Sequence, residues 1–473
     1  MRQLSYVFLA IPLALGIDAC SDGGLRNTDP LGTDAGANDG GGGGDSSAPK
    51  PVVELSGEIT ADKSLTASND YLMKGIVFVK AGATLTIAKG TTIMGETSTK
   101  ATLVIQPGAK IVAEGTEDEP IIFTSRANAD ARRAGDWGGI IVLGNAPVNI
   151  RDTNGTATTG NVEGITTGGT YGGSNADDNS GTLKYIRIEY AGVQLSPDNE
   201  INGLTLAGVG RGTSVSYVQV RHALDDCFEF FGGTVNAHHL ACQYNQDDGF
   251  DWDNGFSGKL QFLVLQQDPT FADDTNGFEG DNDAKGSANE PFSSPTIYNA
   301  TLCGKNADVA KQQYGFLLRR GTKAKIANAI AMGFEAGIDI RDALTRDHTK
   351  SSALSITNSI IFGSVGPAAQ LADGVSYLES QTTDKAALDY DDDGALDEAA
   401  WWKAGGNRTI DPGIEGCFNG DAPVFGPKAS LTDGAAAPPN DGFFDSSASY
   451  VGAFKDKDDN WATRGKWASW SKK

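Results

Sequence analysis

The sequence is short of positive charge and of long apolar segments. It has 38 Lys and Arg residues against 61 Asp and Glu residues, which gives a formal net charge of −23. Phosphate contacts need clustered Lys and Arg, so this balance argues against binding to nucleic acid and against adhesion to anionic lipid. The acid excess fits a solvated, extracellular surface that binds cations, or simply a large protein kept soluble by its charge.

Histidine and cysteine are also scarce, with four and five residues respectively. No Ser-His-Asp set emerges, no Cys-His pair suggests a thiol nucleophile, and the Cys spacings match no zinc pattern. His238-His239 is most simply part of a strand surface. If Cys20 is set apart, the other four Cys allow three disulfide pairings, and the sequence does not choose between them.

The one continuous apolar run, Leu4 to Ile17, is too short to span a membrane and follows Arg2, which is typical of an export signal. The residues that end at Cys20 resemble the lipobox of bacterial lipoproteins, in which this Cys carries the lipid. We therefore expect residues 1–19 to be a lipoprotein signal peptide and residues 20–52 to be the lipidated Cys and a flexible Gly/Asp/Ser linker. The alternative is a plain secretory signal with a nearby Cys. The resemblance implies a protein lipid-anchored in the outer membrane or at the cell surface of a Gram-negative bacterium.

One short phrase recurs with variations along the chain. It reads Asp226-Cys-Phe-Glu229, Asp248-Gly-Phe-Asp251 and Asn276-Gly-Phe-Glu279, with fainter copies at residues 314–317 and 336–339. The spacings of 22, 28, 38 and 22 residues are typical of a β-solenoid, in which equivalent positions of successive coils stack. The Phe residues are then predicted to form an interior column and the trailing acids an exterior ladder.

Alternating apolar residues indicate further coils. The segments 83–93 and 101–111 superimpose with a shift of 18 residues, which we interpret as about one coil of three short strands. We expect the parallel β-helix to cover residues 53–362, with a surface excursion at about 149–180. Asn299, Asn328 and Asn358 predict a stacked Asn ladder.

Beyond residue 362 the repeat weakens. We expect residues 363–473 to hold an irregular loop, one helical stretch at about 396–403, a final coil and an aromatic C-terminal cap that hides the open edge of the last coil.

Several longer phrases resemble a family of right-handed parallel β-helix proteins that Gram-negative bacteria export. They lie at residues 85–115, 135–145, 186–192, 204–210, 223–258 and 450–454, the last together with Trp461. The resemblance implies an all-β fold, a right-handed parallel β-helix (solenoid) with surface loops. The fold is similar to that of pectate lyases and other polysaccharide-active β-helices, but fold similarity alone carries no activity.

Acidic residues cluster around the repeated phrase and are candidate metal ligands. They are Asp225, Asp226, Glu229, Asp247, Asp248, Asp251, Asp253 and Glu279. Stacked strands lie about 4.8 Å apart, so outward acids on neighbouring coils repel unless a cation lies between them, and calcium accepts such irregular oxygen sets. The alternative is that these Asp residues bond to backbone N–H groups in turns.

A second acidic cluster, with Asp389, Asp391 and Asp393, resembles the calcium loop of EF-hand and dockerin modules. Ala400 stands where that loop needs its final acid, although Asp397 or Glu398 could substitute. An acidic surface loop is the alternative.

Candidate catalytic residues are Asp226, Asp248, Asp251, Arg319 and Arg341. Lyases of this fold pair calcium-binding acids with a basic residue, and glycosidases use two carboxyl groups. Salt bridges between these Arg residues and the acids are the alternative.

The sequence thus favours a tethered, monomeric lipoprotein that binds carbohydrate or another surface partner, with calcium on its acidic face. The alternatives are a calcium-dependent polysaccharide lyase or glycoside hydrolase, and a structural envelope component.

Overall fold

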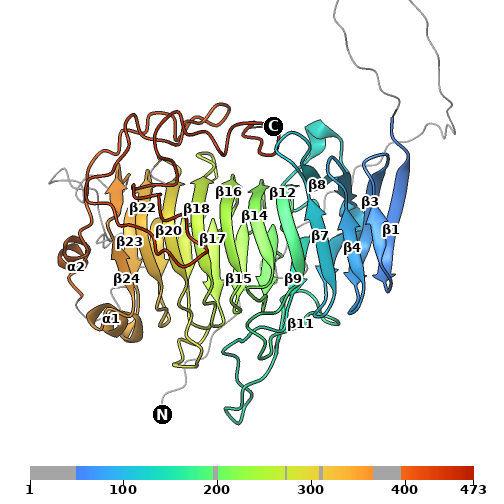
Figure 1. The fold of residues 1–473 in the computed structure, drawn as a ribbon, viewed down its shortest axis with the longest axis horizontal. Helices are drawn as coiled ribbons and strands as arrows, with labels where there is room; N and C mark the ends of the chain where they lie inside the picture. The colour runs from blue at the N-terminus through green and yellow to red at the C-terminus, as the bar shows by residue number, and fades with distance from the viewer. Residues whose placement is uncertain (1–48, 195–200, 272–273, 308–312, 366–395, 473) are drawn as a thin grey trace, which may run out of the picture. The chain divides into compact units, whose positions relative to one another are not determined.

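The computed structural model describes residues 49–194, 201–271, 274–307, 313–365 and 396–472. Within these residues the backbone coils into a 23-stranded sheet whose neighbouring strands pair in parallel, with short-range connections between the strands of each coil (Figure 1). The predicted all-β parallel β-helix is therefore confirmed.

The first coils use strands of three to ten residues, and most of these strands alternate buried and more exposed positions. These are β1 (Val52–Ile59), β2 (Lys63–Leu65), β3 (Asp70–Val79), β4 (Thr84–Ile87), β5 (Thr92–Gly95), β6 (Thr102–Ile105), β7 (Lys110–Glu114), β8 (Ile121–Ser125) and β9 (Gly139–Leu143), with 3₁₀ turns η1 (Thr97–Thr99) and η2 (Ala129–Ala131). Leu85 pairs with Ile111, so this coil is 26 residues long. The predicted coil of 18 residues is wrong. The shift of 18 residues superimposes β4 on β6, two strands of one coil that share the same alternation, and β7 at the end of the second segment already belongs to the next coil.

Each later coil combines a long strand and a short one. The long strands are β12 (Gly181–Glu189), β14 (Ser214–Arg221), β16 (Asn236–Gln243), β18 (Lys259–Gln266), β20 (Thr296–Cys303) and β22 (Lys325–Met332), and the stack ends in β24 (Ser355–Thr357) and β25 (Ile360–Phe362). The short strands are β13 (Leu204–Ala207), β15 (Phe228–Phe231), β17 (Phe250–Asp253), β19 (Phe278–Gly280), β21 (Tyr314–Leu318) and β23 (Ala336–Ile340).

The predicted interior column of Phe residues is confirmed. The rings of Phe228, Phe250, Phe278 and Phe316 follow one another with centroid distances of 5.3, 5.6 and 5.7 Å, and all four are fully buried. The register continues from Phe316 to Ile338. The column forms because the phrase places the same large apolar side chain inward at one position of each successive coil.

The long strands bend at a repeated position. Seven non-glycine residues there have φ between 50° and 59°, namely Tyr185, Tyr217, His239, Phe262, Asn299, Asn328 and Asn358. The first four carry rings that stack along the outside of the coils, with 4.3 Å between the centroids of Tyr217 and His239. These rings form an apolar row on the outside of the coils, which would be exposed to solvent unless another segment packed on it.

The cover is a segment that we name the C-terminal strap, residues 413–472. Trp461 lies 4.8 Å from the ring of His239, and Trp467 lies 5.7 Å from that of Tyr217. The strap extends along the side of the coils, from a bond between Gly452 N and Asn328 O to one between Lys466 N and Glu117 O. The prediction of a cap over the last coil is therefore wrong for this segment.

The Asn residues of the bend column hold the strap in place. The side-chain amide of Asn299 donates to Tyr450 O at 2.8 Å, that of Asn328 to Ala436 O at 2.8 Å, and that of Asn358 to Gly434 O at 2.7 Å. The predicted column is present, but the amides bond to the strap and not along the column, because the strap presents otherwise unpaired carbonyl oxygens.

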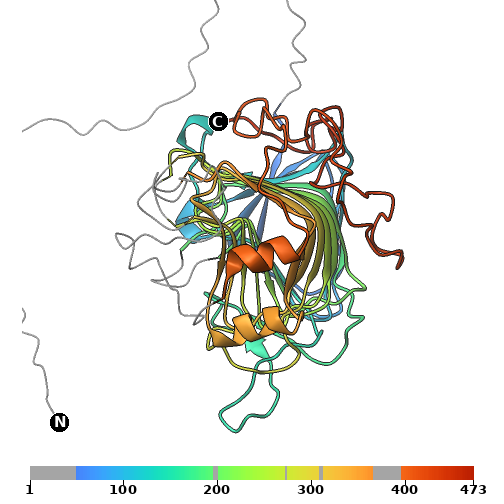
Figure 2. The same ribbon diagram turned by 90° about the vertical axis from the view of Figure 1, so that its left-hand side faces the viewer.

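Two helices lie at the end of the coil stack where β24 is found, and Figure 2 faces this end. They are α1 (Ala343–Lys350) and α2 (Glu398–Ala404), and the second confirms the predicted helical stretch. Trp402 of α2 is 2% exposed, and its ring centroid lies 6.4 Å from that of Phe316. Helix α2 thus closes the apolar interior that the aromatic cap was predicted to close.

Three further features complete the fold. The excursion at residues 149–180 contains the antiparallel pair β10 (Gly160–Asn161) and β11 (Thr170–Tyr171), which lies outside the coils (Figure 1). Disulfides join Cys227 to Cys242 and Cys303 to Cys417, and the second attaches the strap to β20. Among the described residues, no helix has both the length and the apolar character needed to cross a membrane.

Candidate acidic site

The trailing acids of the repeated phrase stack on three neighbouring coils. Glu229 of β15 pairs in register with Asp251 of β17, which pairs with Glu279 of β19. Their neighbours in each strand are the buried Phe residues, so alternation directs the acids to the outside of the coil. The predicted ladder is thus present in the backbone register.

The acids line a cavity of about 410 Å³. Its lining consists of Glu163, Asn202, Asp225, Asp226, Glu229, Asp247, Asp248, Asp251, Asp274, Asn276, Glu279 and Arg319. Seven of the eight acids predicted at this cluster are among them. The eighth, Asp253, does not line the cavity, and its carboxylate accepts from Asn254 N.

The expectation of a solvated exterior ladder is wrong in one respect. Asp226 is only 5% exposed, Asp248 3% and Glu229 9%. The carboxylates point away from the coil interior but line a cavity, and the excursion contributes Glu163 to its lining. The loop therefore partly encloses the acids instead of leaving an open ladder.

The leading residue of each phrase bonds to the next coil. Asp226 Oδ1 accepts from Asp248 N at 2.7 Å, Asp248 Oδ1 accepts from Asn276 N at 2.6 Å, and Asn276 Oδ1 accepts from Tyr314 N at 3.0 Å. The alternative that these residues bond to backbone N–H groups in turns is confirmed for this column. The trailing column makes no such repeated backbone bond, so the two columns have different roles.

Two groups of three carboxylates lie close enough to share an ion. The first comprises Asp225, Asp226 and Asp247, and the second Asp226, Glu229 and Asp251; within each group the ligand oxygens lie within 4.8 Å of one another. Asp226 belongs to both groups. Two buried oxygens beside them, Asn202 Oδ1 and Asp251 Oδ1, have no hydrogen-bond partner. The cavity therefore offers an oxygen-rich donor set of the kind that calcium prefers.

Burial and neighbouring negative charges raise the pKa values of the carboxyl groups in the cavity. Burial, with Asp225 nearby, raises the pKa of Asp226 and of Glu229 well above the usual range. Burial and Glu279 do the same to the pKa of Asp251, and burial and Asp247 raise the pKa of Asp248 to about 7. At neutral pH the cluster must hold either protons or a cation.

The candidate Arg residues form ion pairs, as the alternative held. Arg319 Nε lies 3.0 Å from Asp281 Oδ1, and the same guanidinium bonds to Glu279. Arg341 Nε bonds to Asp339 Oδ2 at 2.7 Å on β23, away from the cavity lining. Arg319 is thus the one basic residue in the lining, and its charge is already engaged.

Asn202 is a cavity residue that the sequence reasoning missed. Leu204 pairs with Phe228, so Asn202 occupies the position of Asp226 one coil earlier. The run Asn202-Gly-Leu-Thr205 is a weaker copy of the repeated phrase, with Leu for Phe and Thr for the acid. Reading the repeat with any apolar residue at its third position would have found it.

The remaining predicted site residues lie elsewhere. Cys20, Asp389, Asp391 and Asp393 lie outside the described residues. Asp397 caps the N-terminus of α2 by accepting from Ala400 N at 2.8 Å.

Comparison with known proteins places the coils in a family. A family model described as a pectate-lyase-like β-helix domain matches residues 57–407. No curated protein and no solved structure matched the chain.

Proposed function

The chain belongs to the pectate-lyase-like β-helix family, and on that premise we propose that it is an exported carbohydrate-binding protein whose acidic cavity holds calcium. The observation that carries the proposal is that two sets of three close carboxylates have Asp226 in common. Calcium takes six to eight oxygen ligands in irregular geometry, and the cavity supplies carboxylates from three coils beside the unpartnered Asn202 oxygen. A bound cation would replace the protons that the crowded carboxyl groups otherwise retain.

Carbohydrate is the partner that this cavity suits. Its walls are almost entirely polar, and its volume of about 410 Å³ leaves space beside an ion. Calcium with incomplete protein ligation accepts hydroxyl or carboxylate oxygens from a sugar. The proposal includes export as a monomer and a lipid anchor at Cys20, which would hold the β-helix at the outer membrane or cell surface.

Calorimetric titration of calcium into chelator-treated full-length protein tests the cation site. We expect saturable binding that releases protons, measured by repeating the titration in buffers with different ionisation enthalpies. Asp226→Asn removes a charge from both groups and should weaken binding at least tenfold. The matched control is Asp347→Asn on α1, an exposed acid with 59% side-chain exposure. Equal calcium affinity in wild type and Asp226→Asn would contradict the assignment.

Polysaccharide cleavage is the second candidate, because Asp248 has a pKa of about 7 and is therefore suited to proton transfer near neutral pH. Incubation with a panel of neutral and acidic polysaccharides tests it. New reducing ends or unsaturated products that disappear in Asp248→Asn would establish catalysis over binding alone. If the wild type neither binds nor cleaves any of them, a structural envelope role replaces both candidates.

The anchor has its own test. Cys20→Ser should move the protein from the membrane fraction to the soluble fraction. Retention in the membrane fraction would reject lipidation at this residue.

A further inference from the structure

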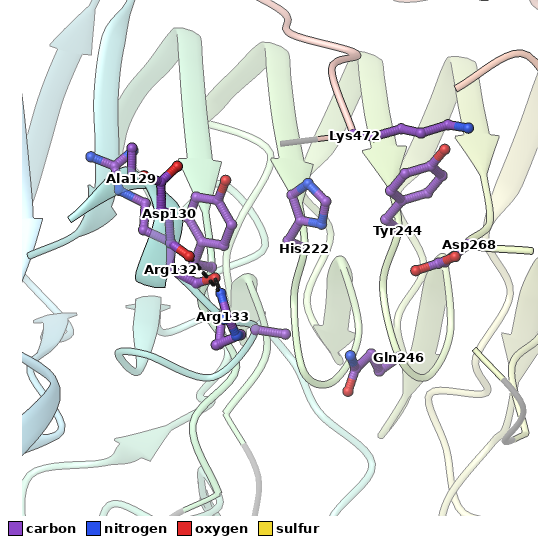
Figure 3. A pocket seen from close by; sticks show the side chains of 11 residues that line it. Ala129, Asp130, Arg132, Arg133, His222, Tyr244, Gln246, Asp268 and Lys472 are labelled. Atoms are coloured by element: carbon purple, nitrogen blue, oxygen red, sulfur yellow. Dashed lines mark hydrogen bonds between the residues drawn. The ribbon is translucent and has the colours of Figure 1, made fainter. Parts of the chain in front are cut away.

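A second cavity, of about 490 Å³, lies where the long strands β12, β14 and β16 end (Figure 3). It shares no lining residue with the acidic cavity. Figure 3 shows Arg132 and Arg133 on one side, Lys472 and Tyr244 on the other, and His222 between them. We name it the basic groove.

The floor of the basic groove is a row of rings from three successive coils. Tyr190, His222 and Tyr244 each follow the last residue of a long strand, and those last residues pair in register. The ring centroids of Tyr190 and His222 lie 5.1 Å apart, and those of His222 and Tyr244 lie 5.5 Å apart. The row therefore repeats the same type of surface along the coil axis.

The three ring residues share an uncommon backbone conformation. Their φ angles are 62°, 51° and 58°, in the left-handed region that bulky residues seldom adopt. The bend column of the long strands has the same conformation, so it is a regular feature of these coils. Here it turns a ring toward the groove at every coil, although Tyr190 and Tyr244 expose only 7% and 6% of their surface.

The groove is basic on a strongly acidic protein. Three of its side chains are cations, Arg132, Arg133 and Lys472, and two are acids, Asp130 and Asp268, so the lining has a net positive charge while the whole chain has a formal net charge of −23. Arg132 is partly engaged, since its guanidinium lies 5.8 Å from the Tyr190 centroid and 3.9 Å from Glu189. Arg133 and Lys472 are exposed and stand at the two sides of the groove, and Arg133 Nη1 donates to the backbone oxygens of Asp130 and Arg132. This placement attracts anionic groups at two separated points.

Neutral and acidic groups also line the groove, and they favour a ligand that has hydroxyl groups as well as negative charges. Asp268 and Gln246 line the groove beside Tyr244. Burial, together with the neighbouring Arg221, lowers the pKa of His222 to about 4, so its ring is neutral at pH 7. A densely charged polyanion would be repelled by Asp268, whereas hydroxyl groups can donate to it and exchange hydrogen bonds with Gln246.

We propose that the basic groove binds an anionic oligosaccharide along the coil axis. Its carboxylate or sulfate groups would contact Arg133 and Lys472, and its hydroxyl groups would contact the ring row, Gln246 and Asp268. The site goes beyond the proposed calcium cavity and needs no calcium. It would give the β-helix two separate contacts with one glycan surface.

Calorimetry on full-length protein in excess chelator tests the groove. The probes are three hexasaccharides of matched length, one with carboxylates, one with sulfates and one neutral. We expect at least one anionic probe to bind at least tenfold more tightly than the neutral one. The double variant Arg133→Ala/Lys472→Ala should abolish that preference. Lys325→Ala, which removes an exposed cation outside the groove, should leave it unchanged.

Three outcomes would overturn the proposal. The first is equal binding of the anionic probes by wild type and the double variant, and the second is no binding of any probe in chelator. The third is equally tight binding of a polyglutamate peptide of the same charge, which would make the groove a general anion site. Calcium titration without sugar still reports on the acidic cavity in each case, so failure here is distinguishable from failure of the proposed function.

Discussion

The backbone N–H of Asp248 donates to the carboxylate of Asp226 on the preceding coil, at 2.7 Å. The same carboxylate belongs to both candidate ligand groups of the acidic cavity. One side chain therefore joins two coils through one oxygen while its charge contributes to the crowding of the cavity. Structural and ligand-binding roles overlap at this residue, and variants that keep the acceptor but remove the charge can separate them.

Asp226→Asn should stabilise the protein when calcium is absent. The amide oxygen can still accept from Asp248 N, while the repulsion that raises the pKa of Asp226 is removed. We expect a gain in unfolding free energy on the order of 1–2 kcal/mol in chelator. Urea unfolding with excess chelator measures it, and Asp347→Asn is the control. A loss of stability in chelator would show that the carboxylate itself is needed by the fold.

Stability in chelator should fall as pH rises. Burial raises the pKa of Asp248 and of Asp253 to about 7, against a reference value of 3.8. Between these values the folded state holds protons that the unfolded chain releases, so this contribution is complete below about pH 4 and lost above about pH 7. We expect a decrease on the order of a few kcal/mol across that window.

Urea unfolding at a series of pH values measures this slope. The double variant Asp248→Asn/Asp253→Asn should flatten it, and saturating calcium should reduce it by taking the place of the protons. A slope that neither change alters would place the responsible groups elsewhere.

The disulfide between Cys303 and Cys417 should matter more than the one between Cys227 and Cys242. The first closes 114 residues and the second 15. Loop-closure entropy gives about 4.7 kcal/mol for a loop of about 100 residues and about 3 kcal/mol for one of 15. We compare Cys303→Ser/Cys417→Ser with Cys227→Ser/Cys242→Ser by thermal unfolding. Limited trypsin digestion should cut the strap at Lys455 or Lys457 faster in the first variant only; equal rates would show that the strap is held without this bond.

Trp467→Ala should detach part of the strap. Its ring is fully buried and lies near both Tyr185 and Tyr217. Truncating such a ring costs about 3–5 kcal/mol. Trp401→Ala, at a half-buried ring on α2, is the control and should cost less. Hydrogen exchange should show new exposure of β12 and β14 amides in Trp467→Ala; protection equal to that of wild type would mean that the other strap contacts suffice.

The stacked positions of the coils could be predicted from the sequence, whereas the path of the strap could not. The Phe column was readable because one residue type recurs at one position, and inward stacking follows from strand alternation. The coil length was misread because Leu85 and Leu103 sit in strands of the same coil that have the same pattern. The strap has no repeat at all, so only its aromatic content was visible, and that content suits an end cap and a lateral cover equally.

For the acidic cavity, the repeat predicted most of the lining acids but not their burial or their ion pairs. The phrase identified seven acids of the lining, and their register follows from the coil. Their burial did not follow, because the cavity also includes Glu163 of the excursion, which belongs to no repeat. Nor could the sequence assign the ion pairs of Arg319, which join residues 38 and 40 positions apart.

The path of the strap has a consequence for how such a protein can change in length. Parallel coils in register make each coil replaceable, since an inserted coil would meet the same partners above and below. The strap does not share this freedom, because it must reach from Asn328 to Glu117 with a fixed number of residues. A duplicated coil between those points would leave it too short. The length of the strap must therefore change together with the number of coils that it crosses.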